Sequence, residues 1–241
     1  MDGIAVVREA PTWRLVLRRL LVVPGIRWLG PGWPDAGRRI VQLPALEPLI
    51  ERAVSANPPM STVLNAGVGE GLYSPTIRRY TQGATLLEFD FAPPRRSDEP
   101  HTQRFRASLT AIPVRSASVD LAVCTEVLEH VADDRQAVAE LRRVLKPRGF
   151  LVLSVPTPPA IFDPAHAREG YTLDELRDKF EVEGLTIIEV RFCMHAFFQA
   201  VLRYWRPRRM PLGLILALAW LDRVIRPGKP MDMAVLAQVV R

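Results

Sequence analysis

Three glycines at alternate positions, Gly67, Gly69 and Gly71, follow directly on a short apolar run at 62–66. Alternating glycines let a backbone pass close to a bound molecule and adopt conformations that other residues avoid. A turn of this kind directs backbone N–H groups and a helix N-terminus at a polar or anionic group. The spacing predicts a ligand-binding turn after a buried strand. It differs from the dinucleotide pattern G-x-G-x-x-G, because position 72 is Leu.

Two acidic residues lie at the end of the next apolar run, 84–90. Glu88 and Asp90 are two positions apart, so they share one face of a strand. An ionised acid at a strand end can accept hydrogen bonds from two hydroxyl groups of a ligand. We prefer Asp90 for this role because it ends the apolar run, and Glu88 is its rival.

Two histidines are candidates for proton transfer. His130 belongs to the segment TEVLEHV at 125–131, and His166 lies in the segment after the apolar run 150–155. An unperturbed imidazole titrates near neutrality, so either ring could act as general base toward a hydroxyl substrate. The structural alternatives are that His130, together with Glu129, fixes the loop and the helix start, and that His166 hydrogen-bonds its own loop.

Strands and helices that alternate along the chain would position these residues. The apolar pattern predicts strands at 62–66, 84–90, 104–108, 119–124, 150–155, 185–190 and 233–240, and helices from 44, 74, 133, 172, 194 and 211. Such alternation is typical of an α/β fold with a doubly wound, mainly parallel seven-stranded sheet.

Local signals predict where these helices begin. Pro44 suits a first helical turn after a loop at 30–39, and Ser74 suits an N-cap with Pro75 at the first helical position. Thr172 and Glu175 have the spacing of a capping box.

The charge of this 241-residue chain is unevenly distributed. Its formal net charge of +6 divides into +3 over 1–59, −4 over 60–190 and +7 over 191–241. The acidic centre argues against a core surface built for a nucleic-acid backbone, and any anionic partner is expected at the ends.

Cysteine usage and apolar runs indicate the compartment. Cys124 and Cys193 have no partner at metal-ligand or disulfide-framework spacing, so we expect no metal site and a reducing, cytoplasmic setting. The run at 20–23 ends too soon for a secretory signal, and the run at 210–221 is shorter than a membrane span.

Two segments outside the predicted core carry both apolar and basic residues. An amphipathic helix is expected within 13–29, packed on the domain or lying at a membrane interface. The nearly all-round apolar helix at 211–225 is expected to be buried as a cap over the active site or at a dimer face. Its alternative is seating on a membrane surface, with the arginines at 203–209 against phosphates.

Four stretches in this order resemble the class I S-adenosylmethionine-dependent methyltransferases of the small-molecule type. They are VLNAGVGEG at 63–71, LLEFD at 86–90, FRASLTAIPVRSASVDLAVCTEVLEHV at 105–131 and LRRVLKPRGFLVLSVPT at 141–157. The resemblance covers roughly 45–190, and HAREGYTLDELRDKF at 166–180 is also like the downstream half of the family. It implies a Rossmann-like methyltransferase fold and S-adenosyl-L-methionine as cofactor.

The resemblance also implies roles for particular residues. Asn65 and the three glycines would line the methionine part of the cofactor, Asp90 would hold the ribose hydroxyls, and Ala107, Ser108 and Leu109 would contact the adenine. Thr125 and Glu126 would flank the transferred methyl group. Asn65 stands where the family usually has Asp or Glu, and Ser108 where an Asp often contacts the adenine amino group; Asn cannot supply a charge to the cofactor's ammonium.

These observations predict four segments. Residues 1–43 form an N-terminal extension, 44–192 a cofactor-binding core, 193–232 a helical insertion and 233–241 the last strand of the core sheet. The predicted function is methyl transfer to a small or amphiphilic acceptor at oxygen, with a glycan or a lipid-linked precursor as candidates. The alternatives are an inactive cofactor-binding scaffold or regulatory module, and an RNA methyltransferase. We expect a cytoplasmic protein, and the alternative is a peripheral position on the inner face of the membrane. The oligomeric state stays open.

Overall fold

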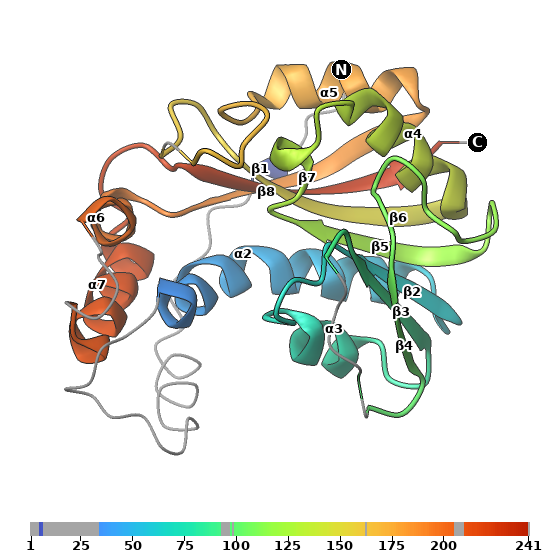
Figure 1. Ribbon diagram of the computed structural model, residues 1–241, viewed down its shortest axis with the longest axis horizontal. Helices are drawn as coiled ribbons and strands as arrows, with labels where there is room; N and C mark the ends of the chain where they lie inside the picture. The colour runs from blue at the N-terminus through green and yellow to red at the C-terminus, as the bar shows by residue number, and fades with distance from the viewer. Residues whose placement is uncertain are drawn as a thin grey trace.

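A computed structural model describes residues 5–6, 34–92, 97, 99–161, 163–204 and 210–240. One twisted sheet forms the middle layer, with helices on both of its faces (Figure 1). The helix predicted within 13–29 lies outside the described residues.

The sheet has the strand order β1-β7-β8-β6-β5-β2-β3-β4, in which only β8 runs antiparallel to its neighbours. Its strands are β1 (Ala5–Val6), β2 (Thr62–Ala66), β3 (Thr85–Asp90), β4 (Thr102–Arg106), β5 (Val119–Thr125), β6 (Leu145–Pro156), β7 (Leu185–Cys193) and β8 (Asp232–Val239). The predicted seven-stranded, mainly parallel sheet is confirmed. The two-residue strand β1 adds an edge that the prediction did not include.

Alternate residues of the buried strands point to opposite faces of the sheet and pack into two separate hydrophobic cores. Helices α4 (Asp134–Val144) and α5 (Leu173–Val182) cover one face, where Ala122 and Leu151 contribute to the core. Helices α2 (Pro34–Ala56) and α3 (Ser74–Tyr80) cover the other, where Val123 and Val152 point. Because both faces are covered, the central strands are apolar at most of their positions. All seven residues of β5 are buried.

Helix α2 begins ten residues earlier than the sequence indicates. It starts at Pro34 and continues through Pro44 and Pro48, so the expected loop at 30–39 and the helix start at Pro44 are wrong. An interior proline removes one backbone hydrogen bond and is costly in an isolated helix. Here the fully buried Leu49 and Ala53 fix the helix on the sheet. Tertiary packing outweighs the local proline signal.

The other helix starts follow their local signals closely. Helix α3 begins at Ser74, with Tyr73 in the N-cap position, one residue before the predicted cap. Thr172 and Glu175 form both hydrogen bonds of the predicted capping box at the start of α5.

The insertion folds as two helices, α6 (Ala196–Tyr204) and α7 (Leu212–Ile225), which pack against the N-terminal part of α2. A Cβ on Gly37 would lie 2.5 Å from the Phe198 ring and 3.0 Å from Ile215, so α2 approaches both helices closely. Asp222 on α7 accepts the backbone N–H groups of His195 and Phe198 at the start of α6. The insertion therefore extends the core of that face.

Helix α7 is only half buried, whereas its all-round apolar sequence predicts a buried helix. Its exposed apolar side chains are Leu214, Trp220, Val224 and Ile225. Of the helices at 34–56 and onward that the structure describes, none combines the length and the hydropathy of a bilayer span.

Candidate active site

The glycine turn lies where three parallel strands end. Ala66, the last residue of β2, pairs with Cys124 on β5 and with Phe89 on β3. Gly67, Gly69 and Gly71 all have positive φ angles, of 81°, 49° and 79°. The turn therefore needs glycine for its backbone, and it lies between the ends of the strands that carry Asp90 and Thr125.

The three glycines differ in their surroundings. A Cβ on Gly67 would lie 2.1 Å from Cγ2 of Val127, so the loop after β5 packs directly on the turn. A Cβ on Gly69 would meet nothing within 4 Å. Gly69 therefore leaves open space at the carboxyl edge of the sheet, and Gly67 leaves room for the neighbouring loop.

Glu88 and Asp90, the two rival acids, occupy different environments. The Glu88 side chain is fully buried, where it accepts hydrogen bonds from Asn65 Nδ2 at 2.9 Å and Arg104 Nε at 2.7 Å. Asp90 is partly exposed, and its Oδ2 accepts the Gly69 N–H at 2.8 Å. Only Asp90 is thus placed to meet a ligand at the turn.

Asn65 contributes to this arrangement from below the turn. Its side chain is 2% exposed and donates to Glu88, so it is directed at the buried acid. The predicted cofactor contact of Asn65 is untested and stays a prediction.

Ser108 and Leu109 follow β4 and come close to Asp90 through the backbone, because the Ala107 N–H donates to the Asp90 carbonyl at 3.0 Å. The Ser108 hydroxyl is 2.8 Å from that of Thr110, and the Leu109 side chain is buried in the core. The predicted adenine contact is untested, and from Leu109 it would come from the backbone.

Thr125 and Glu126 end β5 beside the turn. Thr125 is buried, and Glu126 has a left-handed φ of 55°. Such a conformation is uncommon outside glycine and persists where the surroundings hold it. The Ser154 hydroxyl donates to Glu126 Oε1 at 2.9 Å, and Arg38 Nη1 lies 3.8 Å from Oε2. The carboxylate of Glu126 is therefore held at the strand edge by β6 and α2.

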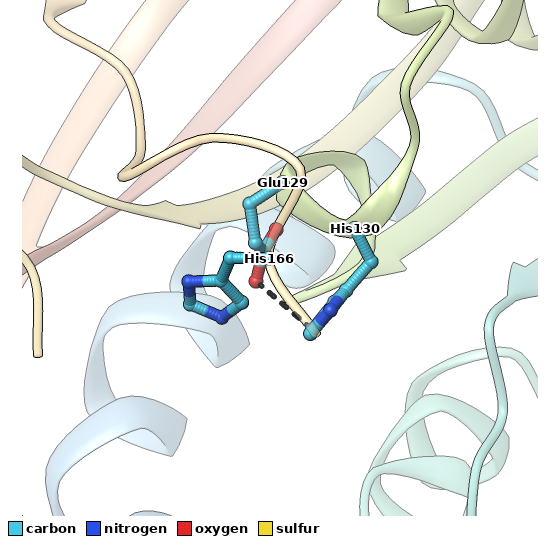
Figure 2. A group of neighbouring side chains, drawn as sticks. All are labelled: Glu129, His130 and His166. Atoms are coloured by element: carbon cyan, nitrogen blue, oxygen red, sulfur yellow. Dashed lines mark ion pairs between the residues drawn. The ribbon is translucent and has the colours of Figure 1, made fainter. Parts of the chain in front are cut away.

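The structure brings the two predicted histidines together. His130, in the short helix η1 (Leu128–His130), and His166 have ring centroids 4.6 Å apart, and the rings meet edge to face. The Glu129 side chain reaches toward both rings, and one ligand atom of each of the three residues lies within 4.8 Å of the others (Figure 2). Burial and the neighbouring His130 lower the pKa of His166, which favours its neutral form.

A network behind the histidines fixes the loop that carries His166. The Ala167 N–H donates to the Glu129 carbonyl at 2.8 Å. Arg168 lies 4.0 Å above the Tyr171 ring and donates to Asp134, which also accepts from the Tyr171 hydroxyl. The loop is thereby connected to both η1 and α4.

The sequence analysis missed a buried polar group on the α2 side of the site. Asp232, at the start of β8, is 1% exposed and accepts from Gln42 Nε2 at 2.7 Å and from Cys193 Sγ at 3.4 Å. Tyr73 donates to Gln42. Gln42 stands among apolar residues of a helix, and Asp232 opens an apolar strand. A polar residue at an otherwise apolar position is the only signal of this group in the sequence.

Electrostatics distinguish the carboxyl groups here. Burial raises the pKa of Asp232 well above its usual range, and the nearby Glu126 raises it further. The same two causes raise the pKa of Glu129. Burial therefore disfavours the charged forms of both acids.

The arrangement can therefore hold a ligand over the turn and present it to a proton acceptor. Asp90 and the open space above Gly69 lie on one side of the carboxyl edge, and the two imidazoles lie close to the point where β5 leads into η1. Open parallel sheets bind ligands at this edge.

Comparisons with known proteins agree with this geometry. A family model described as a methyltransferase domain matches residues 64–153. A probable S-adenosylmethionine-dependent methyltransferase of Mycolicibacterium smegmatis is 31% identical over 145 residues, 55% of each chain. A ubiquinone biosynthesis O-methyltransferase of Xylella fastidiosa is 32% identical over 134 residues, 51% of this chain and 54% of the relative. The chain thus spans about half the length of these curated relatives.

A solved structure shares the fold. The trans-methyltransferase CalH, in complex with SAH, has a TM-score of 0.59 and 14% identity over 81% of this chain and 56% of its own.

Proposed function

We propose that this chain, which belongs to the class I S-adenosylmethionine-dependent methyltransferases, transfers a methyl group from that cofactor to the oxygen of a small or amphiphilic acceptor. The observation that carries the proposal is the contact between Asp90 Oδ2 and the Gly69 N–H, 2.8 Å long. The contact holds a partly exposed acid against the glycine turn at the carboxyl edge, whereas the buried Glu88 is hydrogen-bonded to Asn65 and Arg104.

The turn fits the cofactor that the family uses. The open space above Gly69 and the partly exposed Asp90 support ribose binding at the turn. When bound, S-adenosylmethionine supplies a methyl group on a positively charged sulfur, which keeps the electron pair of the broken bond.

The protein's own contribution is to align the acceptor and remove its proton. Alignment of reacting groups supplies much of the rate in such displacements. His130 Nδ1 donates to the Ala165 carbonyl at 3.0 Å, which leaves Nε2 as a proton acceptor. His166, whose lowered pKa favours a neutral ring, is the second acceptor of the proton that leaves the hydroxyl.

Two observations support the class of acceptor. One relative is named an O-methyltransferase, which supports oxygen as the acceptor atom. The exposed apolar face of α7, with Leu214, Trp220 and Ile225, supports an amphiphilic acceptor, such as a lipid-linked precursor, met at the inner face of a membrane. The acidic central segment argues against RNA as the acceptor.

Calorimetric titration of S-adenosylhomocysteine into the purified chain tests cofactor binding. We expect binding by the wild type and at least a tenfold weaker affinity for Asp90→Asn, because two hydroxyl contacts to a charged acceptor are lost. Asp178→Asn, the same change at an exposed position on α5, should bind like the wild type. No binding by the wild type would overturn the proposal, and binding without turnover of any acceptor would favour the scaffold.

Flotation with vesicles tests the membrane position. The double variant Leu214→Ser/Trp220→Ser should float less than the wild type with anionic vesicles, and high salt should weaken the flotation of both. Val182→Ser removes an apolar side chain that is 82% exposed on α5 and serves as the control. A wild type that stays with the soluble fraction at low salt rules out the membrane position.

A further inference from the structure

Glu129, His130 and His166 form the strongest cluster of metal-ligating side chains among the described residues. Each offers one ligand atom, and these atoms all lie within 4.8 Å of one another (Figure 2). Two imidazoles and one carboxylate are the ligand set of several catalytic zinc sites and of non-haem iron sites. The residues come from η1 and from the loop after β6, so the cluster exists only in the folded chain.

The carboxylate of Glu129 provides an independent indication of a ligand. Glu129 is 1% exposed, yet its Oε2 has no hydrogen-bond partner among the residues that the structure describes. A buried polar atom without a partner carries a substantial desolvation cost. A cation bound by the ligand atoms of the three side chains would give this atom a partner.

The tautomer of His130 suits metal binding. Nδ1 must donate to the Ala165 carbonyl, because a carbonyl oxygen only accepts, and this leaves the Nε2 lone pair facing Glu129, 3.9 Å from Oε1. A backbone carbonyl on the second ring nitrogen is the usual support of a metal-binding histidine. His166 is held by its loop, and Asp163 Oδ2 lies 4.0 Å from its Nε2.

The surroundings favour a cation and leave it accessible. Glu126 and Asp163 add negative potential at the His166 ring, and Arg38 opposes it in part. The His130 side chain is 36% exposed, so an ion can enter from solvent and one coordination position can face solvent. Bonds of about 2.1 Å place tetrahedral ligands about 3.4 Å apart. The three ligand atoms lie within 4.8 Å of one another, so they would need to approach by up to about 1.4 Å, which rotation of the side chains can supply.

We propose that Glu129, His130 and His166 bind one divalent transition-metal ion, of which zinc is the best match, and that its open position takes the acceptor's oxygen. This inference rests on the proposed function and changes the role of the two histidines from proton acceptors to metal ligands. As ligands they cannot accept the proton. The metal instead lowers the pKa of the bound hydroxyl, and its proton leaves to solvent. The acceptor class narrows to molecules whose reacting oxygen can coordinate a metal.

Titration of Co²⁺ into the full chain after treatment with a chelator tests the site directly. Co²⁺ bound to a low-symmetry protein site absorbs in the visible, so the readout is independent of methyl transfer. We expect one ion per chain for the wild type, displacement by Zn²⁺, and at least tenfold weaker binding by His166→Ala and by Glu129→Gln. His101→Asn is the matched control: His101 is an exposed histidine with a φ of 56°, which Asn tolerates, and should bind like the wild type.

Two results would overturn the proposal. One is no stoichiometric ion in the wild type, and the other is binding that both variants retain. His166→Ala changes a side chain on a surface loop, so it keeps the test valid if Glu129→Gln fails to fold. S-adenosylhomocysteine titrations with and without Zn²⁺ separate this test from that of the proposed function. If the chain binds S-adenosylhomocysteine but no metal, only the metal-site proposal is overturned. If the chain does not bind S-adenosylhomocysteine with or without Zn²⁺, the proposed methyltransferase function is overturned.

Discussion

Asn65 Nδ2 donates to Glu88 Oε1 at 2.9 Å, and both side chains are buried. Among the residues that the structure describes, Arg104 supplies the positive charge in contact with Glu88, at 2.7 Å. The pair explains why position 65 departs from the usual acid. A carboxylate there would face Glu88 directly, and one arginine would be left to balance two buried charges.

Asn65→Asp should therefore destabilise the fold by about 1–3 kcal/mol at pH 8. The like charge raises the folded-state pKa of one carboxyl above its unfolded value. The loss of stability of the variant relative to the wild type therefore grows as the pH rises above about 4. Urea unfolding of variant and wild type at pH 5 and pH 8 measures the difference. An equal stability at pH 8 would show that the site tolerates two acids.

Gly67→Ala should cost more stability than Gly83→Ala. Both glycines have a positive φ, of 81° and 85°, but a Cβ at position 67 would overlap Val127, whereas one at position 83 would meet nothing within 4 Å. The backbone strain is common to both, about 1–2 kcal/mol, and the overlap adds about 1–3 kcal/mol. Thermal or urea unfolding compares the two variants.

The double variant Gly67→Ala/Val127→Ala checks the cause. It should recover part of the loss relative to Gly67→Ala alone, because the overlapping methyl group is gone. No recovery would mean that the loss comes from the backbone and not from the packing of Val127 on the turn.

Asp232→Asn should be increasingly stable relative to the wild type as the pH rises. Burial raises the folded-state pKa of Asp232 well above its unfolded value. The folded chain thus holds this proton more tightly, and stability falls as the pH rises from about 4 toward the folded-state pKa. Asn resembles the protonated acid and does not titrate. Unfolding midpoints of both proteins from pH 5 to pH 9 measure the trend, and parallel curves would contradict the buried, protonated Asp232.

Asp134→Asn should behave in the opposite way. Burial acts to raise the pKa of Asp134, but hydrogen bonds from Lys179, Tyr171 and Arg168 outweigh it, so the pKa is lowered. The acid therefore stabilises the fold above its unfolded pKa of about 3.8 and loses this contribution as the pH falls through the lower folded-state value. The variant should be about 1 kcal/mol or more less stable at pH 7, with a gap that closes below pH 4 in acid titrations. A gap of constant size would exclude an ionised Asp134 as its cause.

The sequence was sufficient for most of the fold. Strand β5 is apolar at nearly every position, and a strand covered on both faces must be, so its place in a parallel sheet could be read from composition. The capping box at Thr172 was also predictable, because its two partners are three residues apart. The start of helix α2 could not be predicted, because Pro44 is a local start signal and the packing that overrides it comes from distant segments.

Some features of the candidate site could likewise be predicted from the sequence, and others required the tertiary structure. The residue types at 65–71, at Asp90 and at His130 follow from the sequence, since local patterns and strand ends determine them. The choice between Glu88 and Asp90 was decided by Arg104, which pairs with Glu88 from the neighbouring strand. The meeting of His130 with His166, and of Gln42 with Asp232, 190 positions away, required the tertiary structure. Contacts between segments so far apart leave no periodicity in the chain, and only the packed sheet brings them together.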